Sequence, residues 1–508
     1  MRKNYKEQLA SYVDALYPII YINHFDFKEM DDLIAEIAQG GKILEFNHGV
    51  GAVKFETKRP IESLEKRSDL LEFLKDAAFL DKEEDIKMKS RFIILKDVHN
   101  QLNDPEVISM LKMIAERHMY REDYSATVFI VSSKLVIPEE LENYITVFDI
   151  PVPDQKEIDD IIESFCEEQG TTISEELKSD FSISFRGLNK FQINQILTRA
   201  YQDGGNLVPE DRELILSQKE QLIKKSGLLE MITVKESIDD IGGLDNLKNW
   251  LDKKAKVFEQ LDKAMKYGVD IPKGIMIVGM PGCGKSLAAK ATASLFDLPL
   301  VRLDVGRLLG KYIGESEENM RGALKLAEAI SPCVLWIDEL EKAFSGVGQS
   351  SGAGDVTTRL FGQFLTWMQE KENTVFIVAT GNDISKIPPE FLRKGRFDEL
   401  FSVDFPKPEE RRKIIEIHLK KRNKWNKQDI STLVTGTDGY SGADLEAIVK
   451  EAVETCFIEG KKEVTIEDLL AAKKNTNSIS VALKDRIEKI KESMKNMDLK
   501  PASKVTKK

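Results

Sequence analysis

The chain has 508 residues, a length that suggests about three domains, and 42% of the residues are hydrophobic, which is enough to bury sizeable cores. Lys and Arg number 74 against 86 Asp and Glu, and the resulting net charge of −12 argues against a protein that binds chiefly by coating nucleic-acid phosphates. Because the 4 cysteines stand far apart and no apolar run reaches the ~18–20 residues of a membrane span, we expect neither a disulfide scaffold, nor a Cys-rich zinc site, nor a membrane segment, and we expect a cytoplasmic protein.

Strand-like runs alternate with helical patterns through most of the chain, which predicts an α/β fold with mainly parallel sheets. A first α/β region is expected over 1–205, followed by a charged helical connector over 206–237. A second α/β region is expected over 238–405, and two prolines separate it from a mostly helical segment over 406–478. The remaining residues, 479–508, are rich in lysine and are expected to form a helix and then a solvated end.

A phosphate-binding loop is predicted where Gly279 to Ser286 reads Gly-Met-Pro-Gly-Cys-Gly-Lys-Ser, between an apolar strand and a run of helix formers. In this context backbone N–H groups can close around phosphates at the positive end of a helix dipole. We therefore predict that the chain binds ATP and Mg²⁺, with Lys285 reaching the β- and γ-phosphates and Ser286 holding the metal ion. The nucleotide contacts expected from this segment are Pro281, Gly282, Cys283, Gly284, Lys285, Ser286 and Leu287. Cys283 is interpreted as a small residue that fits the loop, with a redox sensor as the alternative.

Two carboxylates, Asp338 and Glu339, directly follow the apolar run 334–337. Such a run predicts a buried strand, and α/β sheets bind their ligands at the carboxyl ends of their strands. Asp338 is therefore expected to hold Mg²⁺. Glu339 is expected to polarise the water that attacks the γ-phosphate, because this reaction needs a base beside that phosphate.

With these motifs in place, the chain resembles an AAA ATPase over about 238–475. The resemblance implies a P-loop NTPase sheet with a helical lid, and a homo-oligomer, namely a hexameric ring in which each site takes arginine fingers from a neighbour. By this resemblance, Ile241 and Gly242 contact adenine, and His418 lies near adenine and ribose. Asn382 is the sensor that positions the attacking water, and Arg393 and Arg396 are the fingers. Gly442 and Ala443 lie at the start of the lid helix. Ala443 stands where many broader relatives carry a sensor arginine, so hydrolysis would depend more on the fingers.

A further segment resembles the loop that lines the axial pore of such rings, and it consists of Lys311, Tyr312, Ile313 and Gly314. The ring of a tyrosine offers a flat apolar face that can wedge between the side chains of an extended peptide without reading its sequence. The alternative is that Tyr312 packs on its own loop.

The first region repeats features of the second without its catalytic groups. Asp149-Ile-Pro-Val-Pro-Asp154 parallels Asp404-Phe-Pro-Lys-Pro-Glu409, and the run Phe92–Asp97 matches the Mg²⁺ strand if Asp97 is aligned with Asp338. However, the expected strand 19–22 leads into Asn-His-Phe-Asp, which has neither a glycine cradle nor a lysine. We therefore expect a degenerate AAA-like domain that binds no nucleotide. This combination resembles the AAA proteins of cyanobacteria and plastids known as hypothetical chloroplast reading frames.

Three functions are compatible with these patterns. The first is a ring-forming ATPase that unfolds or remodels a protein substrate. The second is an ATP-dependent regulatory or assembly switch that acts through the N-terminal domain as a docking surface. The third is a nucleic-acid motor, which the acidic balance and the lack of a basic aromatic stripe count against.

Overall fold

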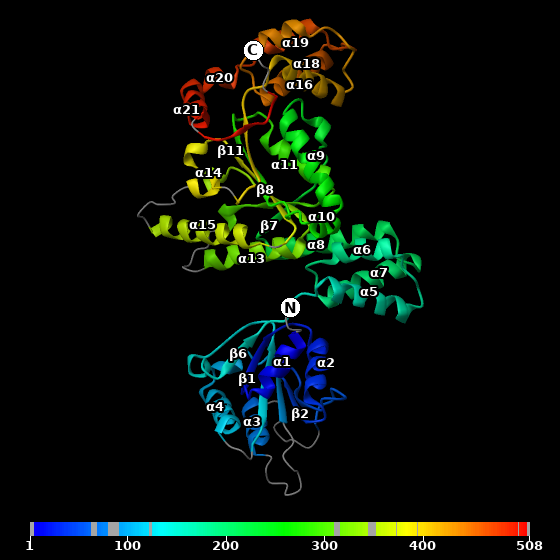
Figure 1. Ribbon diagram of the computed structural model, residues 1–508, viewed down its shortest axis with the longest axis vertical. Helices are drawn as coiled ribbons and strands as arrows, with labels where there is room; N and C mark the ends of the chain where they lie inside the picture. Colours follow the sequence, from blue (N-terminus) through cyan, green and yellow to red (C-terminus); the bar gives the residue numbers. More distant parts are fainter. Residues whose placement is uncertain are drawn as a thin grey trace. The chain divides into compact units, whose positions relative to one another are not determined.

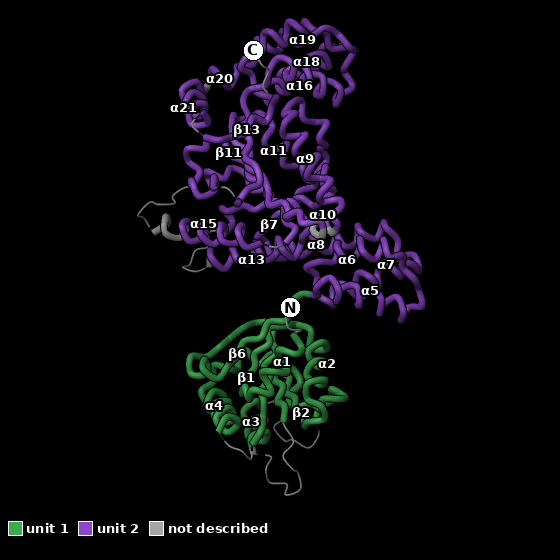
Figure 2. The backbone as a smooth tube through the Cα atoms, in the orientation of Figure 1, with its two compact units in different colours: residues 1–152 green, residues 153–508 purple. Residues whose placement is uncertain are grey.

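The structure, a computed structural model, describes residues 5–61, 69–79, 91–120, 124–308, 315–343, 352–371, 373–393, 395–495 and 497–504. The chain divides into two compact units, Met1–Val152 and Pro153–Lys508 (Figure 2). This division differs from the boundary that we expected near residue 205. Among the helices within the described ranges, none combines the length and the apolar character that crossing a membrane requires.

The first unit is a sheet covered on both faces (Figure 1). Its strand order is β3-β2-β4-β5-β1-β6, and all neighbouring strands are parallel except β2 and β3. Its strands are β1 (Ile19–Asn23), β2 (Lys42–Asn47), β3 (Gly51–Val53), β4 (Arg91–Lys96), β5 (Ala126–Ser132) and β6 (Ile145–Phe148), and its helices are α1 (Tyr5–Asp14), α2 (Phe27–Ala38), α3 (Leu70–Phe79) and α4 (Pro105–Tyr120). Helices α1 and α2 pack on one face and α3 and α4 on the other, which is why the central strands are continuous apolar runs.

The second unit is built around a larger sheet of order β13-β12-β8-β11-β10-β9-β7, in which only the β7–β9 pair is antiparallel. Its strands are β7 (Leu229–Ile232), β8 (Gly274–Gly279), β9 (Leu300–Leu303), β10 (Cys333–Ile337), β11 (Val375–Gly381), β12 (Glu399–Val403) and β13 (Lys500–Pro501). The helices of this part are α9 (Asp245–Glu259), α10 (Leu261–Tyr267), α11 (Lys285–Phe296), α12 (Val305–Leu308), α13 (Glu315–Ile330), α14 (Leu340–Ala343) and α15 (Gly352–Glu370). Helices α9 and α11 cover one face of the sheet, and buried residues of α13 and α15 cover the other.

A helical lid follows the sheet and has its own core, to which α16, α17, α18 and α19 all contribute. Their bounds are α16 (Pro408–Lys421), α17 (Ser431–Gly436), α18 (Gly442–Ile458) and α19 (Ile466–Asn475). Two further helices, α20 (Ile479–Ala482) and α21 (Lys484–Lys495), lead back to the sheet. The fold class expected from the sequence, a P-loop NTPase sheet with a helical lid preceded by a degenerate α/β domain, is confirmed.

Four helices that lie between the two sheets in the amino-acid sequence belong to the second unit. They explain why the chain divides after Val152. They are α5 (Gln155–Gln169), α6 (Glu175–Phe185), α7 (Lys190–Gly204) and α8 (Arg212–Ser226). The buried ammonium of Lys219 donates to the carbonyls of Ile330 and Ser331 at the end of α13, at 3.1 and 3.3 Å. Gly187, with φ +81°, lies so close to Ala329 that a Cβ atom would be 1.7 Å from the carbonyl oxygen of that residue. These helices are therefore fastened to α13, and β7 then adds a strand to the large sheet within the expected connector.

Residues 500–502 are held at the sheet, whereas we expected a solvated end there. Lys500 and Pro501 pair with Phe401 and Ser402 of β12, and Ala502 is fully buried. The expectation was wrong because an alternation of lysine with a few apolar residues does not indicate which of those residues finds a long-range partner.

Candidate functional site

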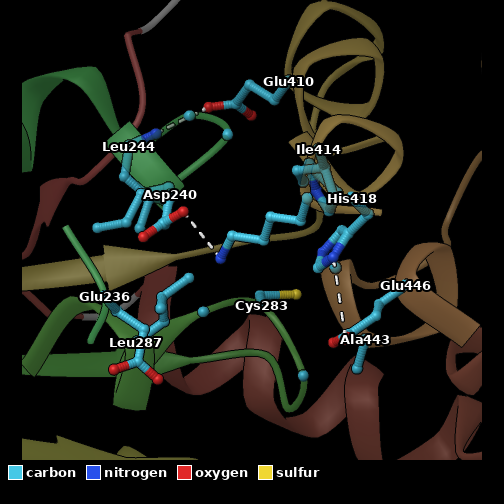
Figure 3. A pocket seen from close by; sticks show the side chains of 18 of the residues that line it. Glu236, Asp240, Leu244, Cys283, Leu287, Glu410, Ile414, His418, Ala443 and Glu446 are labelled. Atoms are coloured by element: carbon cyan, nitrogen blue, oxygen red, sulfur yellow. Dashed lines mark hydrogen bonds and ion pairs between the residues drawn. The ribbon is translucent and has the colours of Figure 1, made fainter. Parts of the chain in front are cut away.

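A cavity of about 620 Å³ lies between the phosphate loop, the segment 240–244 and the lid helices α16 and α18 (Figure 3). Nine of the twelve residues that we expected to contact a nucleotide line it, namely Ile241, Gly242, Gly282, Cys283, Gly284, Leu287, His418, Gly442 and Ala443. The other three, Pro281, Lys285 and Ser286, belong to the same loop and to the first turn of α11. Residues as far apart in the sequence as Ile241 and Ala443 thus meet around one cavity, whose volume is typical of small-molecule sites.

The phosphate loop has the backbone that its glycines allow. Gly282 and Gly284 have φ values of +72° and +87°, and Gly284 is the residue from which α11 starts. A Cβ atom at Gly282 would lie 2.8 Å from Oγ of Ser441 and 3.2 Å from Cβ of Ala443, and the N–H of Ala443 donates to the carbonyl of Gly282 at 3.0 Å. The loop therefore touches the start of α18, and the small side chain of Ala443 is what permits this approach.

Cys283 in this loop does not have the character of a redox sensor. Burial raises the pKa of its thiol to about 12, although the nearby Lys285 lowers it. Because the thiolate is the reactive form, the thiol is unreactive at neutral pH. The interpretation of Cys283 as a small residue that fits the loop agrees with this environment.

The ammonium of Lys285 is held at the loop, 7% exposed, by the carbonyls of Gly279 and Met280, at 3.0 and 2.7 Å. Burial lowers the pKa of Lys285 to about 8, although nearby acidic groups, Glu341 and Asp338 among them, raise it. Among the described residues, the hydrogen-bond partners of this buried cation are neutral carbonyls, so the ammonium retains strong attraction for an anion. The geometry therefore favours a phosphate group in front of this loop.

The lowered pKa of Lys285 predicts how nucleotide affinity depends on pH. Below pH 8 the ammonium carries its proton already, whereas above that pKa binding of an anion must take up a proton. We expect the affinity for Mg·ATP to fall as the pH rises through 8, by up to about tenfold per pH unit. Calorimetric titrations between about pH 6.5 and 9.5 measure this dependence, with Lys285→Arg as the control whose guanidinium does not titrate in this range. An affinity of the unchanged protein that stays constant to the upper limit would contradict the prediction.

The two predicted carboxylates lie just beyond the end of β10. Oδ1 of Asp338 accepts a hydrogen bond from Oγ1 of Thr380 on β11 at 2.6 Å, which fixes the carboxylate at the edge of the sheet. Glu339 has φ +52° and forms an ion pair with Lys342 at 2.8 Å, so its side chain is turned toward α14. In this conformation Glu339 is 41% exposed and would have to leave Lys342 to act on a water molecule in the site.

The predicted sensor Asn382 is fixed by a residue that the sequence analysis missed, Glu341. One oxygen of this carboxylate, Oε1, accepts hydrogen bonds from the backbone N–H and from Nδ2 of Asn382, at 3.1 and 3.2 Å. Glu341 is 6% exposed, and its Oε2 is buried without a hydrogen-bond partner among the described residues. The only signal in the sequence was a third acidic residue two positions after Glu339, and such a signal does not distinguish a buried carboxylate from an exposed one.

The donor set fits a magnesium-bound triphosphate. The carboxylates of Asp338, Glu339 and Glu341 lie near enough to Lys285 to raise its pKa, so carboxylate oxygens are close to the ammonium that we expect to bind phosphate. Carboxylate and hydroxyl oxygens are the donors that Mg²⁺ prefers, and Ser286 at the first turn of α11 supplies the hydroxyl. The residues present would therefore accommodate the metal ion together with phosphate.

The two predicted fingers have different environments. Arg393 is exposed at the end of the short helix Pro389–Leu392. Arg396 is 8% exposed and donates through a guanidinium nitrogen to the carbonyl of Glu390 in its own loop. Of the two, only Arg393 has a side chain that is available to a neighbouring subunit without rearrangement of the loop.

Besides the predicted His418, the cavity is lined by charged side chains that were not predicted, among them Asp240, Lys421 and Glu446. Nδ1 of His418 lies 3.9 Å from Oε1 of Glu446 on α18, and burial lowers the pKa of His418, which is therefore neutral at pH 7. Lys421 of α16 forms an ion pair with Asp240 at 2.8 Å, which a dashed line marks in Figure 3. Burial by itself would raise the pKa of Asp240, but Lys421 and Ser237 lower it. The ion pair joins the segment 240–244 to the lid.

In the first unit, the end of β4 follows the same backbone course as the end of β10. Asp97 and Glu339 both lie just beyond their strand in the left-handed region, with φ +55° and +52°. By this measure Lys96 corresponds to Asp338. However, Oδ1 of Asp97 accepts a hydrogen bond from Oγ of Ser132 at the end of β5, at 3.5 Å, just as Oδ1 of Asp338 accepts one from Oγ1 of Thr380 on β11, so the alignment of Asp97 with Asp338 stays a prediction.

Lys96 is 2% exposed, and its ammonium lies 2.7 Å from Asp31 and 2.8 Å from Glu45. The last residue of β4 is thus a buried cation paired with two carboxylates, of which Glu45 is 2% exposed and Asp31 13% exposed. The loop that precedes α2 runs only from His24 to Asp26, whereas the loop that precedes α11 runs from Met280 to Gly284. These differences are the reason for the expectation that the first unit binds no nucleotide, which stays a prediction.

The predicted pore loop, Lys311, Tyr312, Ile313 and Gly314, lies outside the described residues.

Comparison with known families gives matches over most of the chain. Residues 275–405 match the family described as "ATPase family associated with various cellular activities (AAA)", and residues 427–471 match the "AAA+ lid domain". Residues 5–150 match the "SpoVK-like AAA ATPase, N-terminal domain", and residues 156–226 match the "SpoVK-like AAA ATPase, second domain". The last two matches meet where the structure divides, and the second of them covers α5–α8.

The chain is also similar to individual proteins along nearly its whole length. It is 35% identical to the AAA domain-containing protein ycf46 of Guillardia theta over 94% of this chain and 92% of that protein. It is 35% identical to ycf46 of Pyropia yezoensis over 96% of this chain and 97% of that protein. Over a shorter stretch it is 33% identical to the proteasome-activating nucleotidase of Methanosarcina mazei, covering 51% of this chain and 62% of that protein.

Proposed function

The chain belongs to the AAA ATPase family, and from this premise we propose that it hydrolyses ATP and uses the energy to remodel a protein partner as a hexameric ring. The observation that carries the ATPase activity is the convergence of the phosphate loop, the carboxylates of Asp338 and Glu339, and the amide of Asn382 at the carboxyl ends of β8, β10 and β11. Phosphate release by the purified protein tests this activity directly, with Lys285→Ala as the blank.

Each part of the site has one task in this proposal. Lys285 and the N–H groups of the loop bind the phosphates. Ser286 and Asp338 would hold Mg²⁺, which when bound would neutralise part of the phosphate charge. Glu339 leaves Lys342 and takes a proton from the attacking water. The amide of Asn382 orients that water.

A guanidinium from the next subunit completes the site, because charge builds on the γ-phosphate in the transition state. Arg393 is exposed and is the residue suited to this task. The buried Arg396 acts through the loop by bonding to Glu390 and is a positioning residue.

The contacts of Asn382 with Glu341 lead to a prediction. In Glu341→Ala both hydrogen bonds to Asn382 are lost, and we expect kcat to fall by about 10²-fold while KM for ATP changes little, because the amide orients water and does not hold the nucleotide. Asn382→Ala should give a similar fall in kcat. Steady-state kinetics of the double variant complete the cycle, and an additive second loss would mean that the two residues act independently.

The remodelling activity rests on similarity and on the predicted pore loop. The relative in Methanosarcina mazei is named a proteasome-activating nucleotidase, which supports work on proteins rather than on nucleic acid. The net charge of −12 also counts against a nucleic-acid motor. The second candidate, a switch with the first unit as its docking domain, is favoured by the ion pairs of Lys96, because a domain without a phosphate site is free for binding a partner.

Replacing Tyr312 with Ala distinguishes the remodeller from the switch. For a remodeller that threads its substrate, we expect ATPase activity to stay within about twofold and unfolding of a tailed fluorescent protein to be lost, because the aromatic face is removed. Tyr312→Phe is the matched control and should unfold the substrate normally. If Tyr312→Ala unfolds the substrate as well as the unchanged protein does, threading through this loop is contradicted and the switch is favoured.

A further inference from the structure

We propose that residues 500–504, named here the C-terminal strap, position the segment 240–244 for binding the base of the nucleotide. The strap begins with β13 at the edge of the sheet, and Ala502 donates its N–H to the carbonyl of Ser402 at 2.9 Å. From there it passes the start of α9, which directly follows the segment 240–244. The inference rests on the proposed function, because it takes this segment to be the base-binding part of an ATP site.

The start of α9 depends on the strap for its hydrogen bonds. Leu244 precedes the helix with φ +58°, a region that a leucine adopts only when its surroundings enforce it, and it caps no N–H group with its side chain. The first N–H groups of a helix have no partner within the helix. Here the carbonyl of Ala502 accepts from the N–H groups of Asn246 and Leu247, at 2.9 and 3.1 Å. The strap therefore takes the place of a side-chain cap.

A reciprocal contact runs from the helix to the strap. Nδ2 of Asn246 donates to the carbonyls of Pro501 and Ser503, both at 3.0 Å. These contacts and those of Ala502 join the two segments through four hydrogen bonds across more than 250 positions of the sequence.

The strap also reaches the lid through Glu410 of α16. Oε1 of Glu410 accepts from the N–H of Leu244 at 3.2 Å and from Oγ of Ser503 at 2.6 Å. A Cβ atom at Gly243 would lie 2.5 Å from the same oxygen, and one at Gly242 would lie 2.5 Å from Cγ1 of Ile414. The segment 240–244 is thus confined between α16 and the strap. Gly242, Gly243, Leu244 and Glu410 all line the cavity.

Among the described residues, no hydrogen bond joins the strap to the phosphate end of the site. Lys285 is held by carbonyls of its own loop, and Gly282 is bonded to Ala443. The helix that packs on this loop, α21, ends at Lys495 and precedes the strap, so removal of the strap leaves it in place. Loss of the strap should therefore weaken recognition of the base and leave recognition of the phosphates unchanged.

Two truncations of the full chain test this inference. One removes 500–508 and therefore the whole strap, and its matched control removes only 505–508. Affinities for Mg·ATP and for Mg·tripolyphosphate are measured by calorimetry. For the removal of 500–508 we expect the Kd for Mg·ATP to rise about tenfold, the Kd for Mg·tripolyphosphate to stay within about twofold, and KM for ATP to rise while kcat is kept.

Point variants keep the test valid if the longer truncation does not fold. In the double variant Asn246→Asp with Ser503→Ala, the donor to the strap and the hydroxyl bond to Glu410 are both lost. An aspartate in the first turn of α9 favours the helix dipole, so the helix itself is not weakened. Asn249→Asp, on the exposed side of the same helix, is the control for the added charge. The double variant should give the same selective loss of ATP affinity, and the control should not.

The possible results separate the inference from the proposed function. If the unchanged protein binds neither ligand, the proposed function fails. If the unchanged protein binds Mg·ATP and the variants bind it equally well, the inference about the strap is overturned. The inference is likewise overturned if the variants lose both ligands to the same extent, since the strap would then be a general support of the fold.

Discussion

Replacing Glu339 with Gln is expected to leave Mg·ATP bound and to slow its hydrolysis by about 10²–10⁴-fold, because an amide of the same shape cannot accept the proton of the attacking water. Glu339 lies beyond the end of β10 in a left-handed conformation, and the substitution changes neither the size nor the branching of its side chain. Single-turnover phosphate release measures the rate, and calorimetry measures binding. Turnover at the unchanged rate would refute the assignment of Glu339 as the base.

The ion pair of Glu339 with Lys342 supplies the control. Lys342→Ala removes the partner of Glu339 without touching its carboxylate, so we expect hydrolysis to continue within about twofold of the unchanged rate. If Lys342→Ala is as slow as Glu339→Gln, the ion pair itself is required and proton transfer to Glu339 is not what limits the reaction.

Arg393→Ala is expected to lower hydrolysis by about 10³–10⁵-fold while ATP affinity and thermal stability are retained, since the side chain is exposed in its own subunit. Every site of a ring made only from this variant would lack the finger. Mixing it with Lys285→Ala protein, which keeps Arg393 but is expected to lose its own nucleotide, should restore some activity at the junctions between the two kinds of subunit. Mixed rings that form without any recovery would contradict a finger supplied in trans.

Arg396→Ala is the contrasting variant, because this guanidinium is buried in its own loop and bonded to the carbonyl of Glu390. Its removal leaves that carbonyl without this donor, and we expect a loss of about 1–3 kcal/mol in the free energy of unfolding. Thermal unfolding of the two variants side by side separates the roles. Equal melting temperatures would mean that Arg396 contributes no more to the fold than Arg393 does.

The parts of the site that could be predicted are those that a short stretch of chain specifies by itself. Gly282, Gly284 and Lys285 follow a strand and open a helix, and their spacing alone produces the loop because each requirement is met within a few residues. The carboxylates of Asp338 and Glu339 were predictable for the same reason, since a buried strand must end where the apolar run ends. The parallel sheet then brings both to one edge.

The parts that could not be predicted depend on partners far away in the sequence. A sequence pattern does not indicate that Glu341 bonds to Asn382, that Arg396 turns inward while Arg393 remains exposed, or that Ser503 reaches Glu410. The division of the chain at residue 152 is of the same kind, because α5–α8 look like part of the first region until Lys219 is seen at the end of α13.

From the amino-acid order alone follow the fold class, the phosphate loop and the paired carboxylates, because hydrophobic periodicity and local backbone freedom act over a single turn or strand. Tertiary packing alone decided which carboxylate stays buried, which arginine faces outward and where the last five described residues bind. Burial and long-range hydrogen bonding depend on what surrounds a residue in space, and a lysine-rich end such as 500–504 carries no local mark of the neighbours that it will meet.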